Sequence, residues 1–95
     1  YYVLQSQAQA FAQWTRFPGQ IRLQAFSHIA SGAAMVSYWH WHSIHNAFET
    51  YWKGLLSHDF SRNPTWQEAT TIGADFARLS PQLAELKAEN DVALL

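Results

Sequence analysis

The sequence predicts an α/β fold in which two parallel strands are joined by a helix and each strand runs into a long loop. Residues 1–4 form a short apolar run typical of a buried strand. Apolar residues recur at three- and four-residue spacing over 21–30, which indicates an amphipathic helix. A second run, over 34–41, is rich in aromatic and branched side chains and predicts the second strand. Strand, helix and strand in this order make a βαβ unit of a parallel sheet.

The first loop and the helix that follows it have their own signals. Residues 5–17 are polar and aromatic without a helical or strand period, which predicts a long loop. Pro18 suits the first position of the helix, where a missing N–H costs nothing. Gly32 suits the position after the helix, where a positive φ is common.

The second half of the chain reads as mainly helical. A short helix is predicted over 51–56, and Thr65 with Glu68 has the spacing of a capping box that starts the next helix. One apolar stripe marks that helix, formed by Trp66, Ala69, Ile72, Phe76 and Leu79. Ser80-Pro81 predicts the start of a further helix ending near Asn90, and residues 92–95 predict a new strand.

Composition excludes several classes of protein. The 95 residues carry 48% apolar residues and a net charge of −1, which describes a globular domain with no electrostatic footprint for nucleic acid. No apolar run approaches the roughly 20 residues that span a bilayer. Cysteine is absent, so disulfides and thiolate metal sites are excluded, and we expect a cytoplasmic protein without a cofactor.

Both ends of the chain interrupt apolar runs, so we expect the sequence to be a segment of a larger protein. The change of pattern near Ser80 suggests two parts. Residues 1–80 would complete one domain, and residues 81–95 would form a linker helix and the first strand of the next.

The loop after the second strand is the first candidate for a functional site. Glu49 lies among Phe48, Tyr51 and Trp52, and an acid in such surroundings is partly desolvated and needs a partner or a ligand. A carboxylate among aromatic faces suits a sugar. The alternative is an ordinary solvated loop acid.

Other polar and aromatic residues allow two interpretations each. Gln5, just after the first apolar run, is either ordinary loop polarity or an amide that contacts a ligand. Trp14 is either core or an exposed stacking platform. His40, His42 and His45 suggest a metal set, but no carboxylate or cysteine stands at a recognised spacing, which favours hydrogen-bonded histidines.

Several stretches of the sequence resemble glycoside hydrolase family 42, the microbial β-galactosidases. The most specific is PGQIRLQAFSHIASGA at 18–33, supported by YWHW at 38–41, ETYWKG at 49–54 and SHD at 57–59. The resemblance implies strands 7 and 8 of a TIM (β/α)8 barrel with their helices. It also implies the start of a flavodoxin-like second domain over 81–95, through which the family forms homotrimers.

The resemblance also implies a site. The family's nucleophile is a glutamate at the end of strand 7, in a pattern like Leu-Glu-Thr-Gln, and this chain has Leu4-Gln5-Ser6-Gln7 there. Trp14 matches the sugar-binding tryptophan after one inserted residue, and Glu49 matches the galactose-binding glutamate. Trp52 stands where some relatives have histidine. The acid/base glutamate would lie on strand 4, outside these residues.

These matches imply a retaining β-galactosidase that acts on terminal β-D-galactosides. Because Gln5 is an amide, we expect this chain to be inactive as it stands. Gln5 is either engineered, natural or an error. The alternatives are a non-catalytic carbohydrate-binding protein of the same fold and a histidine-metal hydrolase. We expect galactose or a β-galactoside as partner, and neither nucleic acid nor a membrane.

Overall fold

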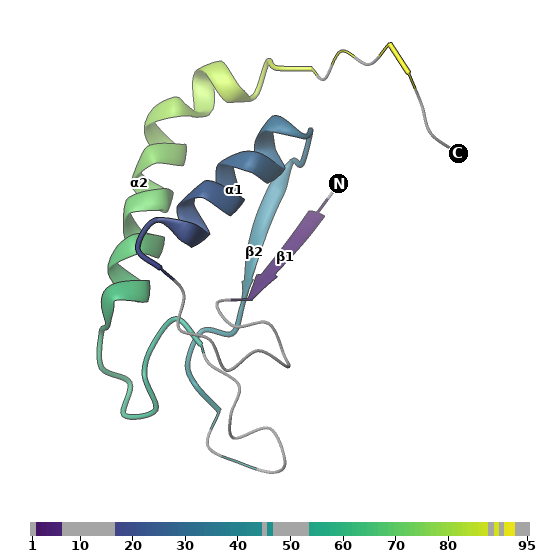
Figure 1. Cartoon of the computed structure of the whole chain (residues 1–95). Coiled ribbons are helices and arrows are strands. Elements are labelled where there is room, and N and C mark those ends of the chain that lie inside the picture. The colour runs from purple at the N-terminus through teal and green to yellow at the C-terminus, as the bar shows by residue number, and fades with distance from the viewer. Residues whose placement is uncertain are drawn as a thin grey trace.

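The computed structural model contains two strands and two helices in the order β1, α1, β2, α2 (Figure 1). It describes residues 2–6, 17–44, 46, 54–87, 89, 91 and 92, and for residues 2–6 it describes the backbone. The four elements are β1 Tyr2–Ser6, α1 Gln20–Ala30, β2 Met35–Trp39 and α2 Pro64–Leu83. The predicted α/β class is therefore confirmed.

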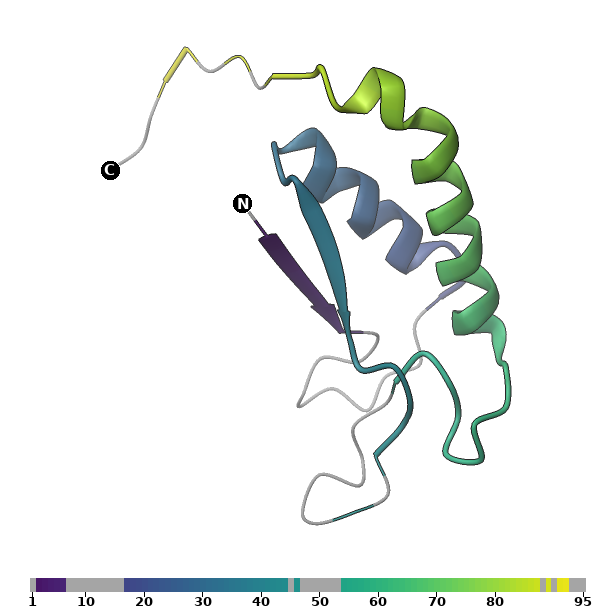
Figure 2. The same ribbon diagram turned by 180° about the vertical axis from the view of Figure 1, so that it is seen from behind.

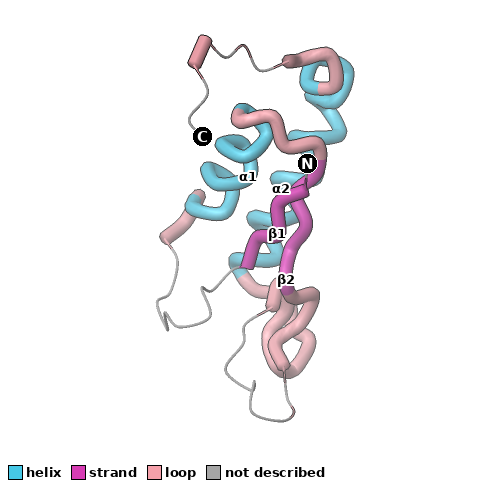
Figure 3. Tube along the Cα trace, turned by 90° about the vertical axis from the view of Figure 1, so that its right-hand side faces the viewer, coloured by secondary structure: helices cyan, strands magenta, loops and turns pink. Residues whose placement is uncertain are grey.

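The two strands pair in parallel, as the sequence predicts. Their register runs from Tyr2 opposite Met35 to Ser6 opposite Trp39. Both strands therefore end at the same edge of the sheet, and the segments that follow β2 gather beyond that edge (Figure 3). The first strand is longer than predicted, because it continues through Gln5 and Ser6, which we had assigned to the loop.

Both helices lie on the same side of the strands, and each runs back from their carboxyl ends (Figures 1 and 2). The buried core joins Ile21 and Ala25 of α1 to Ile72 of α2. Val36 and Tyr38 of β2 pack against it. Met35 and Trp39, which alternate with them, are 46% and 43% exposed, so the opposite face of β2 is open among the described residues.

An ionic contact fixes α1 against α2. Arg22 binds the carboxylate of Asp75 through two nitrogens, at 2.9 and 2.6 Å. Arg78 reaches the other oxygen of Asp75 at 3.0 Å. The backbone N–H of Arg22, in the first turn of α1, donates to Glu68 at 3.1 Å, so α2 supplies an acceptor that α1 lacks by itself.

Both helix starts differ from the prediction. Gly19, with φ of 87°, precedes α1, so Pro18 lies in the turn before the helix. Asn63, and not Thr65, caps α2: its side chain accepts from the N–H of Trp66 at 3.0 Å, and Pro64 occupies the first helical position. The capping box is therefore wrong, and Glu68 serves α1 instead. Gly32 does have the expected positive φ, of 90°.

Two helix predictions for the later part of the chain were wrong, and the strand over 92–95 stays a prediction. Helix α2 continues through Ser80-Pro81 and ends at Leu83, so no new helix starts there. Residues 54–56 are not helical, and Leu56 instead forms an isolated parallel bridge with His42. Val92 lies outside any strand, and residues 93–95 fall outside the described residues. The division into domains at this point stays a prediction.

Candidate functional site

The end of β1 holds the residue on which the chemical interpretation depends. Gln5 is the fourth residue of β1 and pairs with Tyr38, one pair before the end of the sheet. Position 5 therefore lies near the carboxyl end of β1. In TIM-barrel enzymes the catalytic residues lie at the carboxyl ends of the strands and on the loops that follow them. The other predicted site residues, Trp14, Glu49 and Trp52, lie outside the described residues, as does His45.

The chain leaves β2 through a segment of alternating aromatic and imidazole rings. Trp39, which ends β2, is joined to His40 by a cis peptide bond. The rings of Trp39 and His40 meet edge to face at 4.9 Å, and those of His40 and His42 at 5.2 Å. Trp41 lies against His42 at 5.3 Å and remains 58% exposed.

The imidazoles of His40 and His42 are both hydrogen-bonded to backbone carbonyl groups of this segment. The Nδ1 of His40 lies 2.7 Å from the carbonyl oxygen of His42, and the Nδ1 of His42 lies 2.7 Å from that of Ser43. Because a carbonyl only accepts, each Nδ1 must carry the proton and donate it. Among the described residues, no group of three metal-ligating side chains is close enough to hold an ion. In this arrangement His40 and His42 shape the loop.

Two short segments flank residues 44–53, which include Glu49 and Trp52, and are hydrogen-bonded to each other. We call them the loop anchor: residues 40–43 and 54–56. The N–H groups of Leu55 and Leu56 donate to the carbonyl oxygens of His40 and Trp41 at 2.7 and 3.0 Å. The N–H of Ser43 donates back to the carbonyl of Leu56 at 3.0 Å. Residues 43 and 54, which flank the segment 44–53, are therefore held side by side.

Ser43 and Gly54 make the closest contacts of the loop anchor. The Ser43 hydroxyl, on a residue that is 4% exposed, donates to the carbonyl of Leu56 at 3.0 Å and accepts from the N–H of Gly54 at 3.2 Å. A Cβ on Gly54 would lie 2.1 Å from the carbonyl carbon of His42. Only glycine therefore fits at position 54.

Sequence reasoning did not identify Ser43 and Gly54 as site residues. Ser43 has no motif of its own, and its partners lie 11 and 13 residues away in the chain. Gly54 did offer a signal, because an isolated glycine in a run of bulky residues often marks a close approach of two backbones.

The turn after the loop anchor carries the one acid of this region that the structure describes. Asp59 accepts from the N–H of Ser61 at 3.0 Å. Hydrogen bonds from Ser61 hold the pKa of Asp59 below its ordinary value of 3.8. Asp59 therefore caps a backbone turn.

Tyr38 lies beneath the site, on the side of β2 that faces the helices. Burial raises the pKa of its hydroxyl above the ordinary value of 10.0, and the charge of Glu68 raises it further. The hydroxyl oxygen is buried without a hydrogen-bond partner among the described residues. The Tyr38 side chain is therefore neutral and packs β2, the strand paired with Gln5, against the core.

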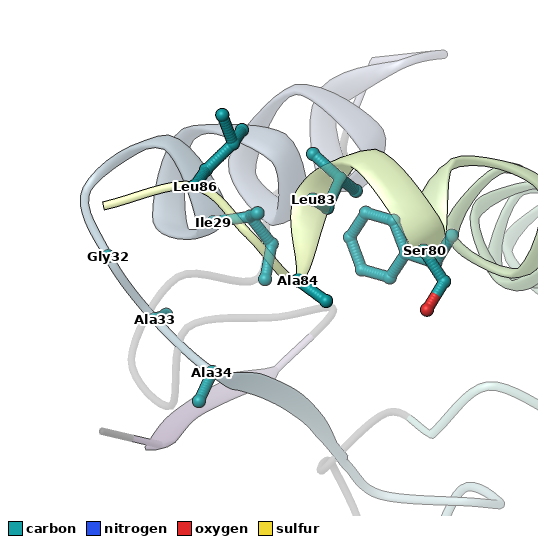
Figure 4. A pocket seen from close by; sticks show the side chains of 9 residues that line it. Ile29, Gly32, Ala33, Ala34, Ser80, Leu83, Ala84 and Leu86 are labelled. Atoms are coloured by element: carbon teal, nitrogen blue, oxygen red, sulfur yellow. The ribbon is translucent and has the colours of Figure 1, made fainter. Parts of the chain in front are cut away.

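A pocket of about 460 Å³ opens at the other end of the unit (Figure 4). It lies between the end of α1 and the last turns of α2, and its lining includes Ile29, Ala33, Ala34, Phe76, Ser80 and Leu83. The lining is mainly apolar, and Ala33 and Ala34 directly precede β2, so the pocket lies at the amino end of this strand. In TIM-barrel enzymes the active site lies at the opposite end, beyond the carboxyl ends of the strands.

Comparison with known families decides the lineage. Residues 4–79 match the sequence profile of glycoside hydrolase family 42, described as β-galactosidase. This match covers most of the chain and includes β1 from Leu4 onward, β2, both helices up to Leu79 and the whole loop anchor. The chain belongs to this family.

Membership in family 42 confirms the resemblance and places the chain in a hydrolase lineage of β-galactosidase type. The family implies a TIM barrel, and the parallel β1–β2 pair with its covering helices is compatible with part of one. A search of curated proteins gives no match. Within the part of the chain that the structure describes, no helix has both the length and the apolar character that crossing a bilayer requires.

Proposed function

We propose that this family 42 chain supplies strands 7 and 8 of a TIM barrel that binds terminal β-D-galactosides. In this proposal the galactose lies beyond the shared carboxyl edge of β1 and β2. The observation that carries the proposal is the position of Gln5, which pairs with Tyr38 next to that edge and lies inside the family match. Parallel strands of a barrel present their site residues at this position.

The mechanism follows from the chemistry that a retaining glycosidase needs. Two carboxyl groups about 5–5.5 Å apart serve as nucleophile and acid/base. A glutamate at position 5 would attack the anomeric carbon and form a covalent glycosyl ester as the glycosidic bond breaks, and the acid/base carboxyl group would give its proton to the leaving oxygen. Gln5 offers an uncharged amide of nearly the same shape, so the sugar still fits but the ester does not form. The proposed state of this protein is therefore sugar binding without normal turnover.

The proposed sugar contacts come from both loops. Trp14 stacks on the apolar face of galactose, and Glu49 accepts hydrogen bonds from its hydroxyl groups, with Trp52 beside it. The loop anchor supports this assignment, because Ser43 and Gly54 fasten the two ends of the segment that contains Glu49 and Trp52. In the same proposal, residues 81–95 lead toward a flavodoxin-like domain, and the intact protein is a cytoplasmic homotrimer.

A paired assay on the intact protein tests the proposal. Gln5→Glu should restore hydrolysis of a β-galactoside by several orders of magnitude, since it returns the missing carboxylate. Gln67→Glu, which makes the same change at an exposed position of α2, is the matched control and should restore nothing. Activity equal to that of the unchanged protein in Gln5→Glu would contradict the nucleophile assignment.

Gln5 itself favours a second candidate, a carbohydrate-binding protein that has lost catalysis altogether. The same experiment separates the two when galactose binding is measured beside activity. Binding without restored activity in Gln5→Glu supports the binding protein, and restored activity supports a disabled hydrolase. The absence of both would refute the proposed function.

A further inference from the structure

Ser43 uses each of its polar groups inside the loop anchor. Its N–H and its hydroxyl both donate to the carbonyl oxygen of Leu56, each at 3.0 Å. The same hydroxyl accepts from the N–H of Gly54 at 3.2 Å, and the Ser43 carbonyl oxygen accepts from the Nδ1 of His42 at 2.7 Å. Because Ser43 is 4% exposed, water does not compete for these hydrogen bonds.

Close packing also restricts the loop anchor. A Cβ at position 54 would collide with the carbonyl group of His42, so the two backbones approach as near as glycine allows. The ring of Phe60 packs against the anchor, 5.9 Å from the ring of Trp41 and 4.8 Å from that of His42. Phe60 keeps this place with a φ of 62°, in the left-handed region that bulky residues rarely adopt. Such a conformation persists only where neighbouring contacts determine it, which indicates a rigid anchor.

The position of the loop anchor connects it with the proposed site. Its first residue, His40, directly follows Trp39, the last paired residue of β2. The anchor therefore begins at the carboxyl edge of the sheet, beyond which we propose that galactose binds (Figure 3). In the sequence, Glu49 lies six residues after Ser43 and five before Gly54. A segment whose two flanking residues are joined has fewer conformations open to it than a free one.

From this arrangement we infer that Ser43 is a positioning residue for galactose, because its hydroxyl joins the two segments of the loop anchor before the sugar arrives. The inference rests on the proposed function and adds Ser43 to the residues on which galactose binding depends. Ser43 does not touch the sugar in this proposal and acts through Glu49. Ordering a loop at the moment of binding costs free energy, and a segment that is already closed at its base loses less of it.

The first test measures the galactose affinity of the intact protein by calorimetry. Ser43→Ala removes both hydrogen bonds of the hydroxyl and should weaken galactose binding about tenfold, or about 1.4 kcal/mol. Ser57→Ala removes a hydroxyl that accepts from Asn63 outside the anchor, and this matched control should bind galactose like the parent. Ile72→Val lowers stability from within the core and should also leave the affinity unchanged, which separates lost positioning from lost stability.

Hydrogen exchange of the unchanged protein gives a second test, which does not depend on the folding of a variant. If the closed anchor favours galactose about tenfold, bound galactose must favour the closed anchor by the same factor. Exchange at the Gly54 amide, which donates to Ser43, should therefore slow about tenfold in saturating galactose. The amide of Trp66, which donates to Asn63 outside the anchor, is the control and should slow less.

The results distinguish the inference from the proposed function. If Ser43→Ala binds galactose like the parent, or if galactose slows the Gly54 and Trp66 amides equally, the inference is wrong and the proposed function stands. If Ser57→Ala or Ile72→Val weakens galactose as much as Ser43→Ala does, affinity merely follows stability, and the inference is again wrong. If Ser43→Ala does not fold, the exchange experiment decides alone. If the parent binds no galactose, the proposed function fails, and the inference fails with it.

Discussion

The hydroxyl oxygen of Ser43 accepts a hydrogen bond from the backbone nitrogen of Gly54 at 3.2 Å. The two residues are 11 positions apart in the chain. The contact is buried, so water cannot replace it. Its consequence is geometric: residues 43 and 54, which flank the segment 44–53, are held close together. The segment that contains Glu49, for which we propose galactose binding, is thereby flanked by residues that are tied to the end of β2.

Gly54→Ala should disrupt this anchor. The added Cβ would lie 2.1 Å from the carbonyl carbon of His42, and backbone cannot move aside as a side-chain tip can. We expect the free energy of unfolding of the intact protein to fall by about 1–3 kcal/mol, as for overpacking elsewhere.

Gly73→Ala is the matched control, because a Cβ there meets nothing within 4 Å. In the interior of α2 it should stabilise the protein by about 0.5–1 kcal/mol. Urea unfolding of both variants measures the two effects, and a Gly54→Ala protein as stable as the parent would refute the close approach.

Ser43→Ala should leave the Gly54 N–H buried without its acceptor. The cost of an unpaired buried donor is about 1–3 kcal/mol, and hydrogen exchange at the Gly54 amide should quicken by a matching factor. Ser57→Ala removes a hydroxyl that accepts from Asn63 at 3.1 Å outside the anchor, and it should leave exchange at Gly54 unchanged. Equal effects of the two variants on Gly54 would contradict the role of Ser43.

The sequence was sufficient for those elements whose signals are local. The apolar spacing of Ile21 and Ala25 identified α1, and the pattern around Val36 and Tyr38 identified β2, because each set faces one core. The start of α2 was misread although its signal was present. Proline at position 64 suits the first helical residue and makes Asn63 the cap, so Thr65 lies inside the helix.

The end of α2 shows a different limit. Ser80-Pro81 has the pattern of a helix start, yet Pro81 lies inside α2, two residues before its end. Proline has no N–H to donate to the carbonyl four residues earlier, and the helix ends two residues after it. For the site, the sequence placed Gln5 near a strand end, which the pairing with Tyr38 confirms. The loop anchor and the Trp41–Phe60 contact join residues distant in sequence, and no local pattern reports such contacts.

Asp75 should make stability depend on pH. Hydrogen bonds from Arg22 and then Arg78 hold its pKa below the ordinary 3.8. Since the folded state favours the ionised carboxylate, the stabilisation is complete above about pH 4 and is lost as pH falls through the lowered pKa. Asp75→Asn should therefore be less stable than the parent at pH 7, and the difference should shrink below pH 4.

Denaturant unfolding of the parent and of Asp75→Asn between pH 2 and pH 7 measures this difference. Arg22→Gln, which removes the first partner, should reduce the effect of Asp75→Asn at neutral pH. A difference that is the same at every pH would show that the charge of Asp75 contributes nothing.

Tyr38→Phe should preserve or increase stability, although Tyr38 packs against the core. Its hydroxyl oxygen is buried and has no hydrogen-bond partner among the described residues. Burying the hydroxyl therefore costs desolvation free energy that no hydrogen bond offsets, and Phe avoids this cost. We expect a gain of up to about 1 kcal/mol in the free energy of unfolding, measured in urea, with an unchanged m-value. Tyr38→Leu is the control: it loses the ring and should destabilise the protein. A clear loss of stability in Tyr38→Phe would mean that the hydroxyl does have a hydrogen-bond partner and would contradict this prediction.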